Sequence, residues 1–263
     1  MPAKTFSLSD YDGIIFDLDG TVYRGSHIVP GADITINKLR KLNKRIAFVS
    51  NKTTGTTADY YQFLSDHGIK LSLSEVFNAT LIAGQYLEKN NPDAKFFAIS
   101  EPTFVKEIEN YGLTFTNDPV NVDVVLITLD RDITFPKLEI AAHSLELGAQ
   151  FFAVNIDNTC PVDEGEIWDA GATIAALEKR THRKPEVIFG KPSALMMETV
   201  FGYMQLPPQK LLLIGDRLET DIKMGNDFGI DTALVMTGVK NYLNGNSDVK
   251  PTYIFNSIND LLS

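Results

Sequence analysis

Cysteine is almost missing from this sequence, and so are long apolar runs. Cys160 is the single cysteine among 263 residues, which excludes an intrachain disulfide, and no metal-ligand spacing surrounds it. The longest apolar run, around 124–128, is far too short to span a bilayer. The first ten residues have no apolar signal core. We therefore expect a cytoplasmic protein with no membrane partner.

Positive charge is also in short supply. Lysine and arginine number 24 against 34 aspartates and glutamates, which gives a formal net charge of −10. Such a surface repels nucleic acid and anionic membranes, so neither is an expected partner. A small phosphorylated metabolite stays compatible, because a metal ion and a few local cations can reverse the potential inside one cleft. The sequence has no Gly-x-Ser-x-Gly, His-Glu-x-x-His or Gly-x-Gly-x-x-Gly motif.

Short runs that favour strands alternate with amphipathic stretches that favour helices. Several of the strand candidates are continuously apolar, as in parallel strands buried on both faces. This alternation predicts an α/β fold with a parallel sheet and right-handed crossovers. A surface loop is expected over 241–251. The strand candidates are 13–17, 45–50, 95–100, 123–128, 150–155, 186–190, 211–215, 232–236 and 253–255. The helix candidates are 34–42, 57–67, 104–111, 137–147, 171–180, 194–203 and 221–228.

Two aspartates stand two residues apart directly after the first apolar run. They belong to the stretch Asp17-Leu18-Asp19-Gly20-Thr21. Ligands of parallel α/β sheets bind beyond the carboxyl ends of the strands, so two acids placed there can share a cation. One acid can also attack a phosphorus atom while the other moves protons. Taken alone, the pair fits an ordinary Asp-Gly turn equally well.

Three further strand ends carry groups of matching chemistry. Ser50 and Asn51 offer neutral donors for phosphate oxygens, although an Asx turn explains them as well. Lys191 follows an expected strand and can hold a phosphate or an attacking carboxylate, although most lysines are solvated surface charges. Asp216 supplies a third acid at a strand end. Thr220 or Asp221 can cap the helix expected there, and Asp221 can also orient metal-bound water. We expect these groups to meet at one sheet edge.

The middle of the chain carries no comparable set of acids at its strand ends. About 140 residues separate Asn51 from Lys191, which is enough for a separate small domain. We predict a core domain made of residues 1–80 and 187–263, with residues 81–186 inserted as a second domain. The two chain crossings between them would form a hinge.

The motifs, in this order on strand ends, resemble those of the haloacid dehalogenase superfamily of phosphotransfer enzymes. They read Asp-Leu-Asp-Gly-Thr, Ser-Asn, Lys and Gly-Asp-Arg-Leu-Glu-Thr-Asp. The insertion is similar to the type-two cap of that superfamily. The stretches 20–25, 168–172 and 183–186 are similar to its NagD-like branch of sugar-phosphate and nucleotide phosphatases. The resemblance covers nearly the whole chain.

The resemblance implies a Rossmann-like core sheet and Mg²⁺-dependent hydrolysis of small phosphate monoesters. The implied substrates are a sugar phosphate, a nucleoside monophosphate or phosphoglycolate. Asp17 is implied as the nucleophile that becomes an aspartyl phosphate, and Asp19 as the group that protonates the leaving alcohol and then activates water. The implied metal ligands are Asp17, the main-chain carbonyl of Asp19, and Asp216. The implied phosphoryl-binding residues are Thr21, Ser50, Asn51 and Lys191.

Two features of the sequence bear on substrate choice. Lys52 stands where this branch often has asparagine, which affects the contacts of that loop with substrate. The segment Asn155-Ile156-Asp157-Asn158 lies where a specificity segment would face the core cleft, although it also reads as a simple Asn/Asp turn. A phosphotransferase or mutase on the same scaffold is one alternative function. A receiver-like module that only accepts a phosphoryl group is another, and a homo-oligomer is left open.

Overall fold

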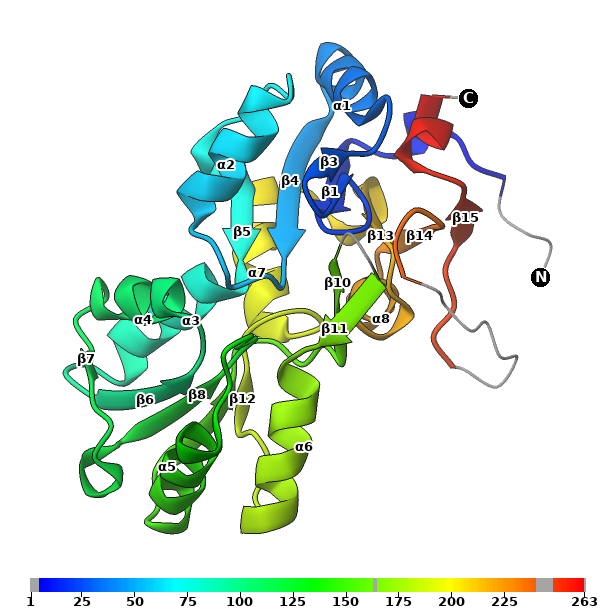
Figure 1. The fold of residues 1–263 in the computed structure, drawn as a ribbon. Coiled ribbons are helices and arrows are strands. Elements are labelled where there is room, and N and C mark those ends of the chain that lie inside the picture. Colours follow the sequence, from blue (N-terminus) through cyan, green and yellow to red (C-terminus); the bar gives the residue numbers. More distant parts are fainter. Residues whose placement is uncertain (1–4, 163–164, 240–247, 263) are drawn as a thin grey trace.

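The computed structural model describes residues 5–162, 165–239 and 248–262, and its first sheet has six parallel strands. The spatial order is β15-β14-β13-β1-β4-β5, with every neighbouring pair parallel. This sheet lies in the upper half of Figure 1. Its strands are β1 (Gly13–Asp17), β4 (Arg45–Ser50), β5 (Val76–Asn78), β13 (Leu211–Gly215), β14 (Asp231–Val235) and β15 (Tyr253–Phe255).

A second parallel sheet of five strands is inserted between β5 and β13 and lies at the lower left of Figure 1. Its order is β12-β9-β8-β6-β7. Its strands are β6 (Lys95–Ile99), β7 (Thr114–Phe115), β8 (Val124–Ile127), β9 (Gln150–Ala153) and β12 (Val187–Ile188). Two antiparallel hairpins complete the strands: β2 (Tyr23–Arg24) with β3 (His27–Ile28), and β10 (Thr159–Val162) with β11 (Gly165–Trp168).

Eight α-helices cover the two sheets within the described residues. They are α1 (Ala32–Lys41), α2 (Thr57–Asp66), α3 (Ala79–Asn90), α4 (Pro102–Glu109), α5 (Phe135–Glu146), α6 (Ala170–Thr181), α7 (Ala194–Met204) and α8 (Lys223–Asp227). A π-helical turn, Leu218–Ile222, leads directly into α8. Short 3-10 turns lie at Leu8–Asp10, Leu73–Glu75, Pro119–Asn121, Pro208–Lys210 and Ile258–Leu262.

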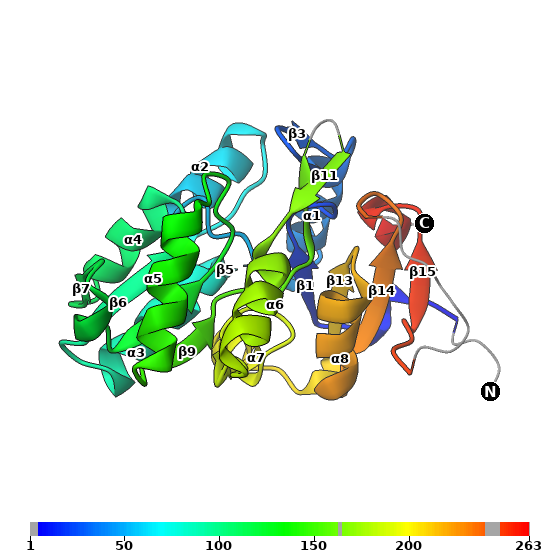
Figure 2. The same cartoon turned by 60° about the horizontal axis from the view of Figure 1, so that its bottom comes forward.

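The helices and sheets form layers, because successive side chains of a strand point to opposite faces. One face of the first sheet packs on α1 and α2. Its other face, with α7 and α3, shares one hydrophobic cluster with the facing side of the second sheet. The far side of the second sheet packs on α5 and α6. In Figure 2, α7 lies in the middle of the molecule, with β9 to its left and α8 to its right. One continuous apolar layer therefore joins the two sheets.

Several elements differ from the sequence-based expectation. The strand expected at 186–190 was placed in the first sheet, and this was wrong: β12 pairs with β9 of the inserted sheet. The pattern did not reveal α3, because this helix lies in the shared apolar layer and shows no clean polar face. The first chain crossing therefore runs through a helix capped by Asn78. The two hairpins were missed because their strands have only two to four residues.

Across the described residues, no helix has the length and apolar character that a membrane crossing requires. The surface loop expected over 241–251 falls largely outside the described residues.

Candidate active site

The first strand delivers Asp17 to the carboxyl end of the first sheet. Asp17 is only 4% exposed, because β1 runs between β13 and β4 in the middle of the sheet. The chain then turns sharply: the carbonyl of Leu18 accepts hydrogen bonds from three successive backbone N–H groups, those of residues 21–23. Gly20 makes this turn with a φ of 90°, a conformation that favours glycine. Asp19 is thereby held beside the strand end.

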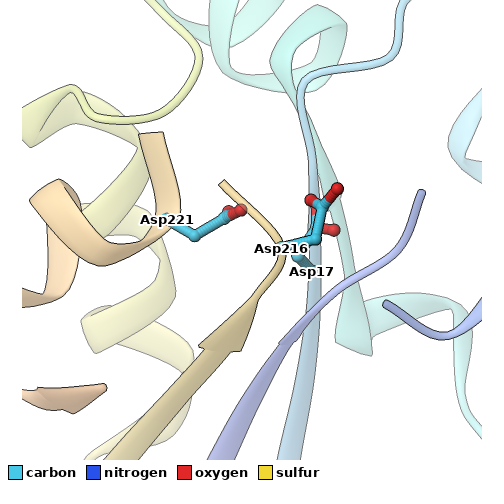
Figure 3. A group of neighbouring side chains, drawn as sticks. All are labelled: Asp17, Asp216 and Asp221. Atoms are coloured by element: carbon cyan, nitrogen blue, oxygen red, sulfur yellow. The ribbon is translucent and has the colours of Figure 1, made fainter. Parts of the chain in front are cut away.

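Three carboxylates converge at this edge. Asp17, Asp216 and Asp221 are all buried, and each offers an oxygen within 4.8 Å of the others. Asp216 directly follows β13, the neighbour of β1, and Asp221 comes from the π-helical turn. In Figure 3, Asp221 points from its helical turn toward Asp17 and Asp216, which lie together at the strand ends. The arrangement concentrates hard oxygen ligands, which divalent cations such as Mg²⁺ prefer.

The ammonium group of Lys191 lies inside this acidic cluster. Its Nζ contacts Oδ1 of Asp17 and lies 2.7 Å from Oδ1 of Asp221. Burial lowers the pKa of this lysine, but the two carboxylates more than offset the effect, so its pKa is raised and it stays charged. The expected origin of Lys191 was wrong: it follows β12 of the inserted sheet, so the segment that crosses between the sheets delivers it rather than a strand of the first sheet.

One ammonium does not neutralise three buried carboxylates. Burial raises the pKa of Asp17 well above its ordinary value, and Asp221 and Asp216 raise it further against the opposing effect of Lys191. Burial, followed by Asp221, raises the pKa of Asp216 to about 7. Within the described part of the chain, Oδ2 of Asp17 is buried with no hydrogen-bond partner. The excess of negative charge and this unused oxygen show that the cluster can hold a metal cation.

Glycines leave room for the acids. A Cβ atom at Gly238 or at Gly20 would strike the carboxylate of Asp216, and one at Gly215 would strike Asp221. The backbone N–H of Val239, just beyond Gly238, donates to Oδ2 of Asp216 at 2.8 Å. The segment 237–239 therefore fixes the third acid from the side opposite the strand.

Not all the neutral groups expected to bind phosphate line the cavity. Ser50 lines the cavity, and its hydroxyl accepts from the backbone N–H of Lys52 at 3.1 Å. The amide of Asn51 faces the same cavity, yet it accepts from Lys191 N at 2.7 Å and donates to Lys191 O at 3.1 Å. Thr21 is fully buried and does not line the cavity; among the described residues its hydroxyl has no partner.

The structure adds one contact that the sequence did not reveal. Nζ of Lys52 lies 2.7 Å from Oδ2 of Asp19 and 5.5 Å from the ring centroid of Tyr23. The unusual lysine of the second motif therefore meets the second aspartate of the first. In the sequence, the only sign of this contact was that Lys52 stands directly after Asn51.

The cavity above these residues is closed by the inserted unit. Residues of both units line it. Asn155, Asp157 and Asp169 line it from the inserted side, together with the start of the hairpin β10–β11. Asn155 and Asp157 of the segment 155–158 thus face the core cleft, whereas Ile156 and Asn158 line a separate pocket of the inserted unit.

Three hydrogen bonds join the two sides around this cavity. The amide of Asn51 donates to Oδ2 of Asp157 at 3.0 Å. The hydroxyls of Thr53 and Thr128 lie 2.5 Å apart. The guanidinium of Arg217 donates to the carbonyl of Thr159 at 2.6 Å. The structure is therefore that of a closed site, with both units in contact across it.

A parallel core sheet with three acids and a lysine at its carboxyl edge, closed by an inserted α/β unit, defines a class of phosphate-handling hydrolases. Family models agree with this: residues 14–114 match the haloacid dehalogenase-like hydrolases, and residues 188–261 match the HAD-hydrolase-like family. The chain belongs to the haloacid dehalogenase superfamily and to its NagD-like branch, as its motifs predicted, and is a phosphatase of the type found there.

Similar proteins support this placement over the full length. The sugar-phosphatase AraL of Bacillus subtilis is 32% identical over 250 residues, which cover 95% of this chain and 91% of AraL. A 4-nitrophenylphosphatase from Thermotoga maritima superposes with a TM-score of 0.87 at 30% identity, covering 97% of both chains. The glycerol phosphate phosphatase Rv1692 of Mycobacterium tuberculosis, solved with magnesium, gives 0.83 at 26% identity, covering 97% of this chain and 77% of Rv1692.

Proposed function

We propose that this protein hydrolyses small phosphate monoesters with Mg²⁺ as cofactor, through an aspartyl phosphate on Asp17. The substrates fall in the class of sugar phosphates, nucleoside monophosphates or phosphoglycolate. The observation that carries the proposal is the buried trio Asp17, Asp216 and Asp221 with the ammonium of Lys191 inside it. A phosphatase that works through an aspartyl phosphate needs a nucleophile, a cation site and a fixed positive charge together.

Mg²⁺ fits the donor set, which consists of buried carboxylate oxygens with an uncompensated charge. Asp17, Asp216 and the main-chain carbonyl of Asp19 would hold the ion. When bound, Mg²⁺ offsets negative charge on the phosphoryl oxygens. Asp221 supports the site through two hydrogen bonds: it accepts from Lys191 Nζ and, at 3.1 Å, from the backbone N–H of Arg217.

In the first half-reaction, a carboxylate oxygen of Asp17 attacks phosphorus and forms a new P–O bond. The P–O bond to the substrate's alcohol breaks, and its electron pair stays on the leaving oxygen. Asp19 gives that oxygen its proton, so the products are a neutral alcohol and an aspartyl phosphate. Lys191, fixed beside Asp17, offsets charge on the phosphoryl group.

In the second half-reaction, Asp19 acts as a base. It takes a proton from water while the water oxygen attacks phosphorus, and the bond between phosphorus and the Asp17 oxygen breaks. Inorganic phosphate leaves, Asp17 is again a carboxylate, and Asp19 is again protonated. Ser50 and Asn51, which line the cavity, assist in holding the phosphoryl group, and Asn51 does so partly through its two hydrogen bonds to the backbone of Lys191. Thr21 does not line the cavity, so it is not given this role.

The domain division belongs to the same proposal. Residues 1–80 and 187–263 form the core domain and residues 81–186 the cap, with the short strand β12 contributed to the cap sheet by the start of the second core segment. The cap closes over the substrate and keeps bulk water out during the first half-reaction. A cytoplasmic location fits phosphorylated metabolites as substrates.

A panel of phosphate monoesters tests the proposal. Purified protein is assayed for phosphate release with Mg²⁺ and with a chelator, beside Asp17→Asn. We expect release that depends on Mg²⁺ and is abolished in the variant. Release from no member of the panel, or equal turnover by Asp17→Asn, would show that the proposed reaction is wrong.

A further inference from the structure

The salt bridge between Lys52 and Asp19 lies in the active-site cavity, and the proposed reaction steps give Lys52 no role. Both side chains line the cavity together with Asp17 and Lys191. The side chains of Lys52 and Asp19 are only 24% and 13% exposed, and Nζ lies 2.7 Å from Oδ2. A partly buried pair is screened by salt much less than a surface pair. The ammonium therefore acts directly on the proposed acid–base group.

The two oxygens of the Asp19 carboxylate have different surroundings. Oδ2 accepts a hydrogen bond from Lys52, whereas Oδ1 is buried and has no hydrogen-bond partner among the described residues. Buried polar atoms normally have a partner, so Oδ1 is free to meet a proton or a donor of a bound molecule. An ammonium beside Oδ2 also keeps negative charge on that oxygen. A proton carried by Asp19 therefore belongs on Oδ1.

Several contacts fix Lys52 in this place. Its backbone N–H donates to Oγ of Ser50 at 3.1 Å. Its ammonium lies 5.5 Å from the ring centroid of Tyr23, within the range of cation–π attraction. Tyr23 is buried and packs edge-on against Phe63, and its backbone pairs with that of Asp19 as an isolated β-bridge. Lys52 thus connects the loop after β4 to the turn after β1.

The other two cations of the cavity have different partners. Lys191 contacts carboxylates of the metal site, and Arg217 donates to a backbone carbonyl of the cap hairpin. In the described part of the chain, the cation that pairs with Asp19 is Lys52. Without Lys52, the Asp19 carboxylate would be free to turn about its side-chain bonds.

We propose that Lys52 is a positioning residue for proton transfer: it fixes Asp19 through Oδ2, so that Oδ1 is the oxygen that exchanges protons. In the first half-reaction the proton on Oδ1 moves to the leaving oxygen as the P–O bond of the substrate breaks. In the second, Oδ1 takes a proton from the attacking water. Lys52 keeps its own proton throughout. The inference rests on the proposed phosphatase function.

Two substrates with different leaving groups test this role. 4-Nitrophenolate is a stable anion and leaves without a proton, whereas an alkyl alcohol needs one. The second substrate is the alkyl monoester of the panel that the wild type hydrolyses fastest. Because kcat/KM reports the steps up to the aspartyl phosphate, Lys52→Met should lower it about tenfold or more for the alkyl ester. For 4-nitrophenyl phosphate it should stay within about twofold.

The second half-reaction gives an independent signature. Asp19 acts as the base there for either substrate, so Lys52→Met should slow hydrolysis of the aspartyl phosphate. With 4-nitrophenyl phosphate, kcat and KM should then fall together, and an acid quench should trap more phosphorylated protein than in the wild type. A lysine that binds the phosphoryl group would instead raise KM for both substrates.

A matched control and a conservative variant complete the design. Lys137 of the cap is 32% exposed and pairs with Asp130 at 2.6 Å, outside the cavity, so Lys137→Met should leave both kcat/KM values unchanged. Lys52→Arg keeps a cation that can pair with Asp19 and lie over the Tyr23 ring, and should retain most of the activity on the alkyl ester.

A double variant tests whether the two residues act together. In Asp19→Asn the proton donor is already missing. Adding Lys52→Met to it should therefore change the ratio of the two kcat/KM values by less than about twofold. A change as large as that in the wild-type background would show that Lys52 acts independently of Asp19, which contradicts the positioning role.

The possible failures are distinguishable. If the wild type releases phosphate from neither kind of ester, the phosphatase function is wrong and the role of Lys52 falls with it. If the wild type is active but Lys52→Met changes both kcat/KM values equally, or neither, the positioning role is wrong and the phosphatase function stands. Should Lys52→Met fail to fold, Lys52→Asn, which also removes the charge, decides by the same ratio.

Discussion

The side-chain amide of Asn51 holds the backbone of Lys191 from both sides. Its Oδ1 accepts from Lys191 N at 2.7 Å, and its Nδ2 donates to Lys191 O at 3.1 Å. The two residues are 140 positions apart in the chain. Gly190 permits the contact, because a Cβ atom there would lie 2.5 Å from Asn51 Oδ1. The position of the buried ammonium beside Asp17 therefore depends on this amide.

We expect Asn51→Ala to reduce turnover strongly, because the backbone that carries Lys191 loses both contacts. A buried N–H left without an acceptor also costs about 1–3 kcal/mol of folding stability. Asn78→Ala is the matched control: Asn78 is also buried and bonds two backbone groups, but lies outside the cavity. Both variants should lose stability in denaturant unfolding, and only Asn51→Ala should lose most of its kcat. Equal kcat losses would argue against a positioning role.

Gly238→Ala should weaken the metal site, since its new methyl group would strike the carboxylate of Asp216. Disturbed support of a metal ligand typically costs about 10–100-fold in metal affinity. The measurement is a Mg²⁺ titration of phosphatase activity. Gly202→Ala provides the comparison: nothing lies within 4 Å of its Cβ position inside α7. That variant should keep its Mg²⁺ response and gain about 0.5–1 kcal/mol of stability. An unchanged Mg²⁺ response in Gly238→Ala would contradict the assignment of Asp216.

Removal of the metal should expose the repulsion among the three acids. Because burial and Asp221 raise the pKa of Asp216 to about 7, the folded state binds more protons than the unfolded state between about pH 4 and 7. Without metal, stability from this group is present at low pH and is lost as pH rises toward 7. Asp216→Asn should therefore be more stable than the wild type in chelator at pH 8.

Added Mg²⁺ should reverse that order. It should raise the Tm of the wild type. At a Mg²⁺ concentration of a hundred times Kd, the folded state should be stabilised by about 2.7 kcal/mol. The gain in Asp216→Asn should be clearly smaller, because one ligand oxygen has lost its charge. The same Tm gain in both proteins would show that the ion binds elsewhere.

Asp169 gives a second pH-dependent effect, away from the metal. Its pKa is raised from 3.8 to about 6, mainly by burial and then by Asp157, so its ionisation destabilises the folded state. The wild type should lose up to about 3 kcal/mol as pH rises from about 4 to 6 and beyond. Asp169→Asn keeps an oxygen for Asn155 and Ala170 and should lack this loss. The difference in unfolding free energy between variant and wild type should grow from pH 4 to pH 7. A constant difference would contradict a destabilising ionisation of Asp169.

The sequence predicted the frame of the molecule well, because its central strands carry local signals. The apolar runs 13–17, 45–50 and 211–215 are strands with those bounds, since they are buried on both faces. The sequence signal of an edge strand is weaker: β12 has two residues, and the local pattern does not reveal which strand it pairs with.

The arrangement of the site depends on contacts that local sequence does not encode. The strand ends predicted that Asp17 and Asp216 would lie together. That Lys52 pairs with Asp19 follows from how two loops of the core meet. That Asp169 and Asn155 share a cavity with Lys191 follows only from how the cap packs on the core. Cap side chains come from short turns and a hairpin, where neither helical nor strand periodicity applies.

The most direct measurement is to map the phosphoryl group on the protein during turnover. Enzyme mixed with Mg²⁺ and a monoester is quenched in acid within the first turnovers and digested for mass spectrometry. The Asp19→Asn variant is treated in the same way, because hydrolysis of the intermediate should be slowed in it. We predict one added phosphoryl group on the peptide that contains Asp17, enriched in Asp19→Asn and absent in Asp17→Asn. A phosphoryl group on a different residue, or undiminished turnover by Asp17→Asn, would contradict the central claim.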